Sequence, residues 1–247
     1  CAALLRMKIR SLHPWTVTPK EAVAIQRRLA GRVINTTRLG PVRVVAGADI
    51  AICKESNDGY AGVVVMSFPD LEIVETAAVL APLSFPYIPG LLSFREIPLL
   101  LKAFSRLTRV PDLILVDGQG IAHPRRFGIA CHLGLLLDRP TIGCAKSRLV
   151  GRHKAPPLRR GGIARLYDDN HRVIGAVVRT KDRTNPIYVS IGHKVDLRTA
   201  IRYTLACGRG YRVPEPTRRA HLYVEEIQRN RVRIINIPSS PVRNPSP

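Results

Sequence analysis

The chain has 247 residues, 45% of them hydrophobic, which is enough for a sizeable core and excludes a disordered basic tail. Its 39 Lys and Arg residues against 18 Asp and Glu residues give a formal net charge of +21. Such an excess also suits a solubilising surface or an acidic protein partner, but charge spread over a folded chain favours nucleic acid.

Cysteine spacing and hydropathy limit the cellular locations in which this chain would be expected. The five cysteines are odd in number and show no CxxC or zinc-like spacing, so neither a disulfide framework nor a zinc ribbon is predicted. No apolar run reaches the roughly 18 residues that span a bilayer, and the first ten residues, CAALLRMKIR, lack a signal-peptide pattern. Because the chain does not start with Met, there is room for residues upstream of Cys1. We expect a cytoplasmic monomer that does not contact a membrane.

The first half of the chain predicts a helix followed by three strands. Thr18, Pro19 and Glu21 form a capping-box pattern that starts a helix ending near Leu29. Three β-branched segments then follow with a short turn at Pro69-Asp70 between the last two, at residues 42–52, 62–68 and 71–80. Consecutive strands of this kind indicate an antiparallel meander.

From residue 92 to residue 147, helices and strands alternate, which predicts parallel additions to the sheet, and further strands and helices follow. Helices are expected at 92–107, 125–138, 196–207 (with Asp196 as N-cap) and 217–230, and strands at 112–120, 140–147, 171–180 and 186–195. We therefore predict an α/β fold with a mixed sheet flanked by helices, in a single domain over residues 1–232. The Pro/Ser-rich residues 233–247 are predicted to be a disordered tail.

Three carboxylates stand out from their surroundings. Asp49 lies within the apolar strand VVAGADIAI and Asp117 ends the apolar run LILVDG, where a charge is costly unless it is paired. A buried hydrogen bond would explain Asp49 and a turn would explain Asp117, with a metal ligand as the alternative in both cases. Glu96 fits a capping box with Ser93, yet that position also puts a carboxylate in the first turn of a helix. Together the three acids could converge on Mg²⁺.

The charge distribution agrees with such a centre. Residues 40–100 contain three basic and seven acidic side chains, a net charge of −4, whereas residues 151–183 contain nine basic and three acidic ones, a net charge of +6. An acidic pocket framed by basic segments suits a metal ion surrounded by phosphates.

A further polar cluster follows Asp117 in the segment DGQGIAHPRRFG. Its glycines let backbone approach a ligand, and His123, Arg125 and Arg126 offer hydrogen-bond donors to phosphate. The spacing does not match G-x-G-x-x-G, which disfavours a dinucleotide fold. Lys146 and His221 are ambiguous alone, because most lysines are solvated and most helical histidines are structural.

Five segments in this order resemble the endonuclease V family, repair nucleases for deaminated bases: PYIPGLLSFRE, DGQGIAHPRRFGIA, PTIGCAKSRL, NPIYVSIGH and PEPTRRAH. The similarity runs from about Val44 to Leu222, and several of the motifs are long. The resemblance implies a ribonuclease H-like fold, consistent with the predicted meander followed by alternating helices and strands.

The resemblance also implies roles for individual residues. Asp49, Glu96 and Asp117 would bind Mg²⁺, with Mn²⁺ as a substitute, while His221 and Lys146 would lie beside the metal and the cleaved phosphate. The remaining matches are the strand-separating wedge Pro86, Tyr87, Ile88 and Pro89, and the pocket for an extruded base at Gly90, Leu91, Leu92, Gly118 and Leu149. A wedge must be apolar to replace stacking and stiff to limit its ordering entropy, which explains the prolines around an aromatic ring.

The implied function is a DNA repair endonuclease that recognises deaminated bases, chiefly deoxyinosine, in double- or single-stranded DNA. It would cut the second phosphodiester 3′ to the lesion and leave 3′-hydroxyl and 5′-phosphate ends. One alternative is an endoribonuclease for inosine in single-stranded RNA, and another is a non-catalytic nucleic-acid-binding module. A base-excising glycosylase is disfavoured, since it would need no metal.

Overall fold

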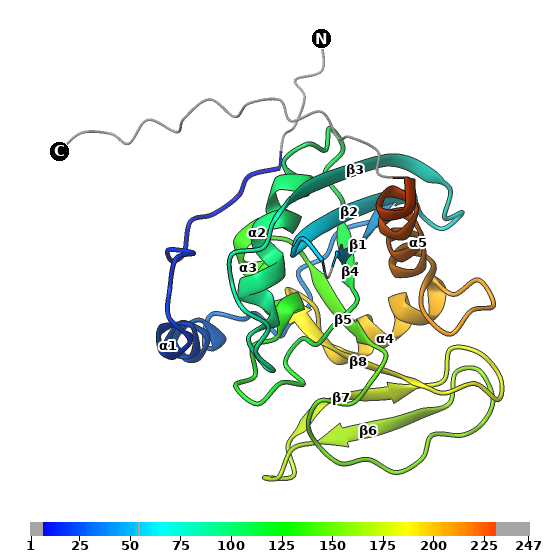
Figure 1. Cartoon of the computed structure of the whole chain (residues 1–247). Helices are drawn as coiled ribbons and strands as arrows, with labels where there is room; N and C mark the ends of the chain where they lie inside the picture. Colours follow the sequence, from blue (N-terminus) through cyan, green and yellow to red (C-terminus); the bar gives the residue numbers. More distant parts are fainter. Residues whose placement is uncertain (1–6, 54, 231–247) are drawn as a thin grey trace.

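A single eight-stranded sheet with helices on both faces organises the chain (Figure 1). The computed structural model describes residues 7–53 and 55–230, so the predicted tail at 233–247 lies outside the described residues. The strand order is β3-β2-β1-β4-β5-β8-β7-β6. Within the described ranges, no helix is long and apolar enough to cross a membrane.

The first part of the fold matches the predicted helix and meander. Helix α1 (Pro19–Ala30) begins with the expected capping box, in which Glu21 N donates to Thr18 Oγ1 and Thr18 N donates to Glu21 Oε2. Strands β1 (Val44–Ile52), β2 (Asp58–Ser67) and β3 (Ile73–Pro82) pair antiparallel in sequence order. Strand β2 starts four residues before the predicted position.

Two helical crossovers then extend the sheet with parallel strands. Helix α2 (Leu92–Phe104) leads to β4 (Leu113–Val116), which pairs parallel with β1. Helix α3 (Ile129–Leu137) leads to β5 (Thr141–Ala145), which pairs parallel with β4. A β3-β2-β1 meander followed by parallel β4 and β5 is the predicted ribonuclease H-like arrangement.

The far half of the sheet is antiparallel. Strands β8 (Ile187–His193), β7 (Val173–Val178) and β6 (Ile163–Tyr167) follow β5 in space and run antiparallel to their neighbours. Sequence analysis missed β6, because its five residues IARLY include an arginine, follow a Gly-Gly pair and lie at the edge of the sheet with one side towards solvent. Helices α4 (Leu197–Ala206), capped by Asp196, and α5 (Glu215–Asn230) complete the fold.

Helices α2 and α3 and strand β4 are shorter than predicted. The helix expected from residue 125 starts only at Ile129, because Gly128 is extended and the residues before it form turns. Helix α2 ends three residues early, and β4 is confined to four residues, which leaves Asp117 just beyond the strand.

The alternation of side chains along β1 separates two apolar layers. Ala46 and Ala48 pack in a cluster with Ile97 of α2, whereas Val45 belongs to the cluster that contains Ala220 of α5. In Figure 1, α2 and α3 accordingly lie on one face of the sheet and α5 on the other. Because alternate residues share a face, Asp49 points to the same side as Val45, towards α5.

Two glycines let α5 lie directly on the sheet. A Cβ at Gly47 of β1 would come within 1.9 Å of the Pro216 carbonyl oxygen, and one at Gly62 of β2 would come within 2.5 Å of Val224 Cγ1. Glycine within a strand commonly marks such a close approach. The same contact brings α5, which carries His221, against β1, which carries Asp49.

We therefore expect Gly47→Ala to push α5 away from β1, since the opposing atom is backbone and cannot rotate aside. Overpacking of this kind costs about 1–3 kcal/mol, or several degrees in Tm, measured by thermal unfolding. The control is Gly31→Ala, where an added Cβ meets nothing within 4 Å. Equal melting temperatures for the two variants would contradict this account of α5.

Candidate active site

Asp49 and Asp117 lie side by side just past the last paired residues of two parallel strands. The last residue pair between β1 and β4 is Ala48 with Val116, so the two aspartates occupy the next position on each chain. Their side chains are 17% and 14% exposed. Burial, followed by the negative charge of Asp117, raises the pKa of Asp49, and a hydrogen bond from His221 opposes that rise.

Glu96 reaches the same centre from α2, but not through the predicted capping box. The N-cap of α2 is Leu91, which makes no side-chain cap, and the first turn contains no acid, so Glu96 lies in the second turn. The Ser93 hydroxyl is instead hydrogen-bonded to Nδ1 of the buried His132, at 3.1 Å. The capping prediction was therefore wrong, because a buried histidine competes for the serine.

The electrostatics of Glu96 link it to both aspartates. Burial, followed by the charges of Asp49 and Asp117, raises the pKa of Glu96 to about 8, and the nearby Arg95 opposes the rise. The effect of one buried charge on another weakens with distance, so Glu96 lies in the same part of the fold as both aspartates. Three acids far apart in sequence therefore act on one another in the fold.

Two nitrogen-bearing side chains, Lys146 and His221, face the aspartates. Lys146 follows β5 and places its Nζ 2.5 Å from Asp117 Oδ2. His221 of α5 places Nδ1 2.8 Å from Asp49 Oδ2 and Nε2 3.3 Å from Glu225 Oε1. The structure thus brings Lys146 and His221 to the predicted centre and adds Glu225, one turn after His221 on the same helix.

The donor chemistry of this centre suits a hard divalent cation. Carboxylates that raise one another's pKa are relieved by a cation between them, and Mg²⁺ prefers such oxygen ligands. In the described part of the chain, no three His, Cys, Asp or Glu side chains are close enough to enclose an ion as they stand. A bound cation would therefore have to draw the carboxylates inward and displace Lys146 from Asp117.

A cavity of about 420 Å³ opens next to the acids and joins three predicted groups. Its walls include the wedge residues Tyr87, Ile88 and Pro89, the expected base-pocket residues Gly90, Leu92, Gly118 and Leu149, and Asp117 with Lys146. Two predicted residues lie elsewhere. Pro86 is exposed on the loop of residues 85–90, called the wedge loop because it carries the predicted wedge, and Leu91 is 2% exposed, packed in the core and absent from the cavity wall.

The carbonyl of Gly90 holds the wedge loop in place. It accepts hydrogen bonds from Gln26 Nε2 at 3.0 Å, Arg125 Nη2 at 2.7 Å and His123 Nε2 at 3.0 Å. Because Nε2 of His123 donates, its Nδ1 accepts from Arg125 N, and burial lowers the pKa of His123 to about 4. Gly90 itself has φ +80°, a conformation that favours glycine.

The three residues predicted to bind phosphate, His123, Arg125 and Arg126, all make contacts within the protein. His123 and Arg125 brace the wedge loop from inside the protein, and Arg126 Nη1 lies 3.2 Å from Asp168 Oδ2. Sequence analysis did not single out Gln26, which is 1% exposed in α1 and also donates to the carbonyl of Phe127. The sequence did contain a signal for Gln26, because a glutamine on the apolar face of a predicted helix is expected to be buried and to need a hydrogen-bond partner.

A ribonuclease H-like sheet whose two central parallel strands carry neighbouring carboxylates, beside a lysine and a histidine, is the arrangement of a nuclease. The family model described as Endonuclease V matches residues 27–222. An endonuclease V from Dehalococcoides mccartyi is 50% identical over 223 residues, which cover 90% of this chain and all of that protein. The chain belongs to the endonuclease V family, metal-dependent hydrolases of the deoxyribonuclease V type.

Solved structures agree with this assignment. The crystal structure of endonuclease V from Streptomyces avermitilis has a TM-score of 0.84 at 40% identity, covering 92% of this chain and 99% of that one. Endonuclease V from Ciona intestinalis, in complex with a DNA containing an inosine followed by a ribo-adenosine, has a TM-score of 0.75 at 26% identity. That match covers 85% of this chain and 98% of that one.

The raised pKa of Glu96 predicts how the stability of the metal-free protein depends on pH. Between about pH 4.5 and 8 the folded protein retains a proton that the unfolded chain has released, so its stability falls as pH rises. Glu96→Gln removes this loss. In urea unfolding with EDTA, the variant should gain on the order of a few kcal/mol relative to wild type between pH 5 and pH 8.

The matched control is Glu72→Gln, on an exposed residue just before β3. Its stability difference from wild type should be the same at both pH values. A Glu96→Gln difference that stays constant with pH would show that Glu96 does not carry this proton.

Proposed function

We propose that this chain cuts nucleic acid at deaminated bases, chiefly deoxyinosine in DNA, at the second phosphodiester on the 3′ side. The products would be 3′-hydroxyl and 5′-phosphate ends. The observation that carries the proposal is the cavity in which the wedge loop meets Asp117 and Lys146. One cavity can then hold the damaged base while the strand continues past the acids.

The shape of this cavity suits a base turned out of the helix. Its volume of about 420 Å³ falls in the range of small-molecule sites, and its walls combine apolar side chains with the half-buried backbone of Gly90 and Gly118. A Cβ at Gly118 would come within 2.5 Å of Ile129 Cγ2, so the wall is closely packed there. Extruding a base costs a few kcal/mol and less for a mismatched one, which favours deaminated bases.

Tyr87 supplies the wedge that would replace the extruded base. Its side chain is 70% exposed at the rim of the cavity, where an aromatic ring can stack on the base pair left behind. The loop is held on one side by the Gly90 carbonyl contacts. On the other side, Arg95 donates to the Phe85 carbonyl and to Asn57 Oδ1, each at 2.7 Å. A loop braced at both ends loses little entropy on binding.

Asp49, Glu96 and Asp117 would hold Mg²⁺, with Mn²⁺ as a substitute. The bound metal supplies an activated water and neutralises charge on the phosphate. Lys146, released from Asp117, would donate hydrogen bonds to phosphate oxygens. The His221 ring, held between Asp49 and Glu225, is placed to orient the attacking water or to take its proton.

We place this reaction in the cytoplasm, with the chain acting as a monomer. The described cysteines at 53, 131, 144 and 207 are free thiols, which agrees with a reducing compartment. The substrate would be DNA, double- or single-stranded, with inosine-containing RNA as the alternative.

The direct test uses an end-labelled duplex with one deoxyinosine, incubated with and without Mg²⁺ and analysed at nucleotide resolution. We expect one nick, at the second phosphodiester 3′ to the lesion, and none in EDTA. The matched inosine-containing RNA strand, run in parallel, decides between the two substrates. Faster cutting of the RNA would replace the DNA assignment.

Two other outcomes would contradict the proposal. Binding without any cutting in Mg²⁺ would indicate a non-catalytic module, and an abasic product formed without metal would indicate a glycosylase. Alanine variants of Lys146 or His221 with undiminished single-turnover cutting would remove the roles assigned to these two residues.

A further inference from the structure

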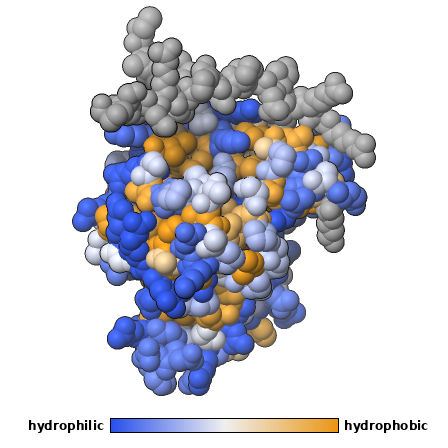
Figure 2. All heavy atoms as spheres, turned by 60° about the vertical axis from the view of Figure 1, so that its left-hand side comes forward, coloured by the Kyte–Doolittle hydropathy of each residue, from blue (hydrophilic) through white to orange (hydrophobic). Residues whose placement is uncertain are grey.

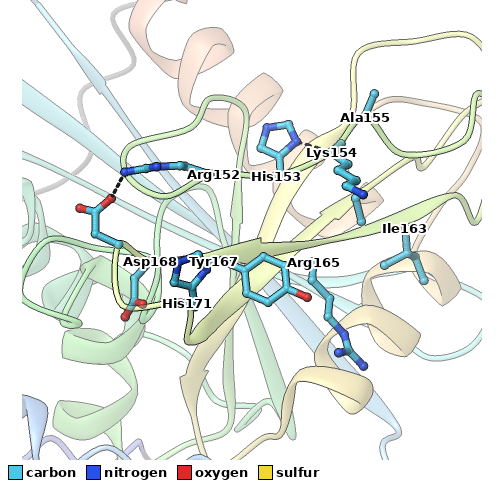
Figure 3. Close-up of a pocket in the computed structure, with 11 residues that line it drawn as sticks. Arg152, His153, Lys154, Ala155, Ile163, Arg165, Tyr167, Asp168 and His171 are labelled. Atoms are coloured by element: carbon cyan, nitrogen blue, oxygen red, sulfur yellow. Dashed lines mark hydrogen bonds and ion pairs between the residues drawn. The ribbon is translucent and has the colours of Figure 1, made fainter.

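A second cavity, larger than the catalytic one, lies at the edge of the sheet. We call it the hairpin pocket. It has a volume of about 610 Å³ between the β6–β7 hairpin and residues 152–155 (Figure 3). The residues that carry the argument are Arg152, His153, Lys154, Ile163, Arg165 and Tyr167.

Backbone pairing builds this pocket. Arg152 N donates to the Tyr167 carbonyl at 2.8 Å, and Tyr167 N donates to the Arg152 carbonyl at 2.9 Å. Arg152 and Tyr167 are the one pair at which residues 152–155 and strand β6, both within the described residues, are joined by backbone hydrogen bonds. The cavity lies between these two segments. Because alternate side chains of a strand share a face, Ile163, Arg165 and Tyr167 line one wall together.

The charge of the pocket favours an anion. Three basic side chains, Arg152, Lys154 and Arg165, line it against the acids Asp168 and Asp169. Arg152 pairs with Asp169 at 3.0 Å, but these side chains are 82% and 85% exposed, and such pairs contribute little. Asp168 is already engaged by Arg126 and by the backbone N–H groups of Asn170 and Arg172. The acids therefore do not prevent the basic side chains from meeting a phosphate.

The pocket also offers surfaces on which bases can stack. Figure 3 shows the Tyr167 ring among the pocket side chains, with His171 and Arg165 on either side of it in that view. Ile163 is 44% exposed on the same face of the strand. In Figure 2, hydrophilic residues gather at the lower end of the molecule, where the hairpin lies in Figure 1. Proteins that bind single-stranded nucleic acid combine basic side chains, which contact the phosphates, with aromatic rings, on which the bases stack.

The position of the pocket relates it to the catalytic cavity. Lys146 and Leu149 line the catalytic cavity, and Arg152, six residues after Lys146, lines the hairpin pocket. Six residues span at most about 20 Å, which is about six nucleotides of a stacked strand. Arg126, from the loop that braces the wedge, reaches Asp168 on the pocket wall.

We propose that the hairpin pocket binds a single-stranded stretch of the strand being cut, within about six nucleotides of the scissile phosphate. Arg152, Lys154 and Arg165 contact its backbone phosphates, and Tyr167 stacks on a base. The inference rests on the proposed function only in taking that strand as the substrate. Its consequence is that flanking sequence, and not the lesion alone, sets the affinity.

The first test compares the triple variant Arg152→Ala/Lys154→Ala/Arg165→Ala with wild type by fluorescence anisotropy in EDTA. The long probe is a single strand with about fifteen nucleotides on each side of one inosine, and the short probe has about two. We expect roughly tenfold weaker binding of the long probe and a salt slope smaller by about 2, with no change for the short probe. The charge-matched control is Lys20→Ala/Arg43→Ala/Lys102→Ala, on other surfaces.

The outcomes separate cleanly. Equal losses for the two triple variants, or equal losses on the long and short probes, overturn the inference. A loss that appears only when the flanks are duplex, or a pocket that binds free mononucleotide while long-strand affinity is unchanged, also overturns it. Weaker long-strand binding by a protein that cuts no inosine substrate would defeat the proposed function and leave the pocket in place.

A second test isolates stacking. Tyr167→Leu retains apolar packing but removes the ring, so it should weaken binding of the long strand about tenfold. Tyr167→Phe should bind as wild type. The Leu variant should make no difference on a strand whose flanks are abasic, since those flanks offer nothing to stack. An equal loss on base-bearing and abasic flanks would show that Tyr167 acts only through the fold.

Discussion

The register between β1 and β4 is the constraint on which the site depends. Parallel pairing up to Ala48 and Val116 forces Asp49 and Asp117 to the same level, where both are largely buried. Two carboxylates in that position repel each other, and Glu96 adds a third from above the sheet. The fold tolerates this because each aspartate has a partner, the Lys146 ammonium for Asp117 and the hydrogen-bonded His221 ring for Asp49.

The rest of the architecture brings those compensating groups to one place. Helix α2 carries Glu96 on one face of the sheet, and α5 carries His221 on the other. The approach of α5 depends on glycine at positions 47 and 62, so sheet packing and site geometry cannot be changed independently. Lys146 follows β5, the parallel strand next to β4, and this position brings its ammonium group to Asp117.

Much of this could be predicted from the sequence, and the failures have physical causes. The meander, the crossover helices and the isolated acids were visible because buried strands are continuous apolar runs in which a charge stands out. Strand β6 was invisible because an edge strand needs no such run. Ser93 was assigned to a helix cap because local spacing cannot reveal a buried partner such as His132, 39 residues away. The hydrogen bonds of His123 and Arg125 to Gly90 are likewise long-range contacts that no motif encodes.

The central claim is that Asp49, Glu96 and Asp117 share one cation, and Mg²⁺ titration calorimetry tests it most directly. If they share an ion, Asp49→Asn, Glu96→Gln and Asp117→Asn each remove most of the binding. The double variants should then be hardly worse than the single ones, because coupled residues are non-additive. Wild-type binding by any single variant, or independent losses that add up, would contradict a shared centre.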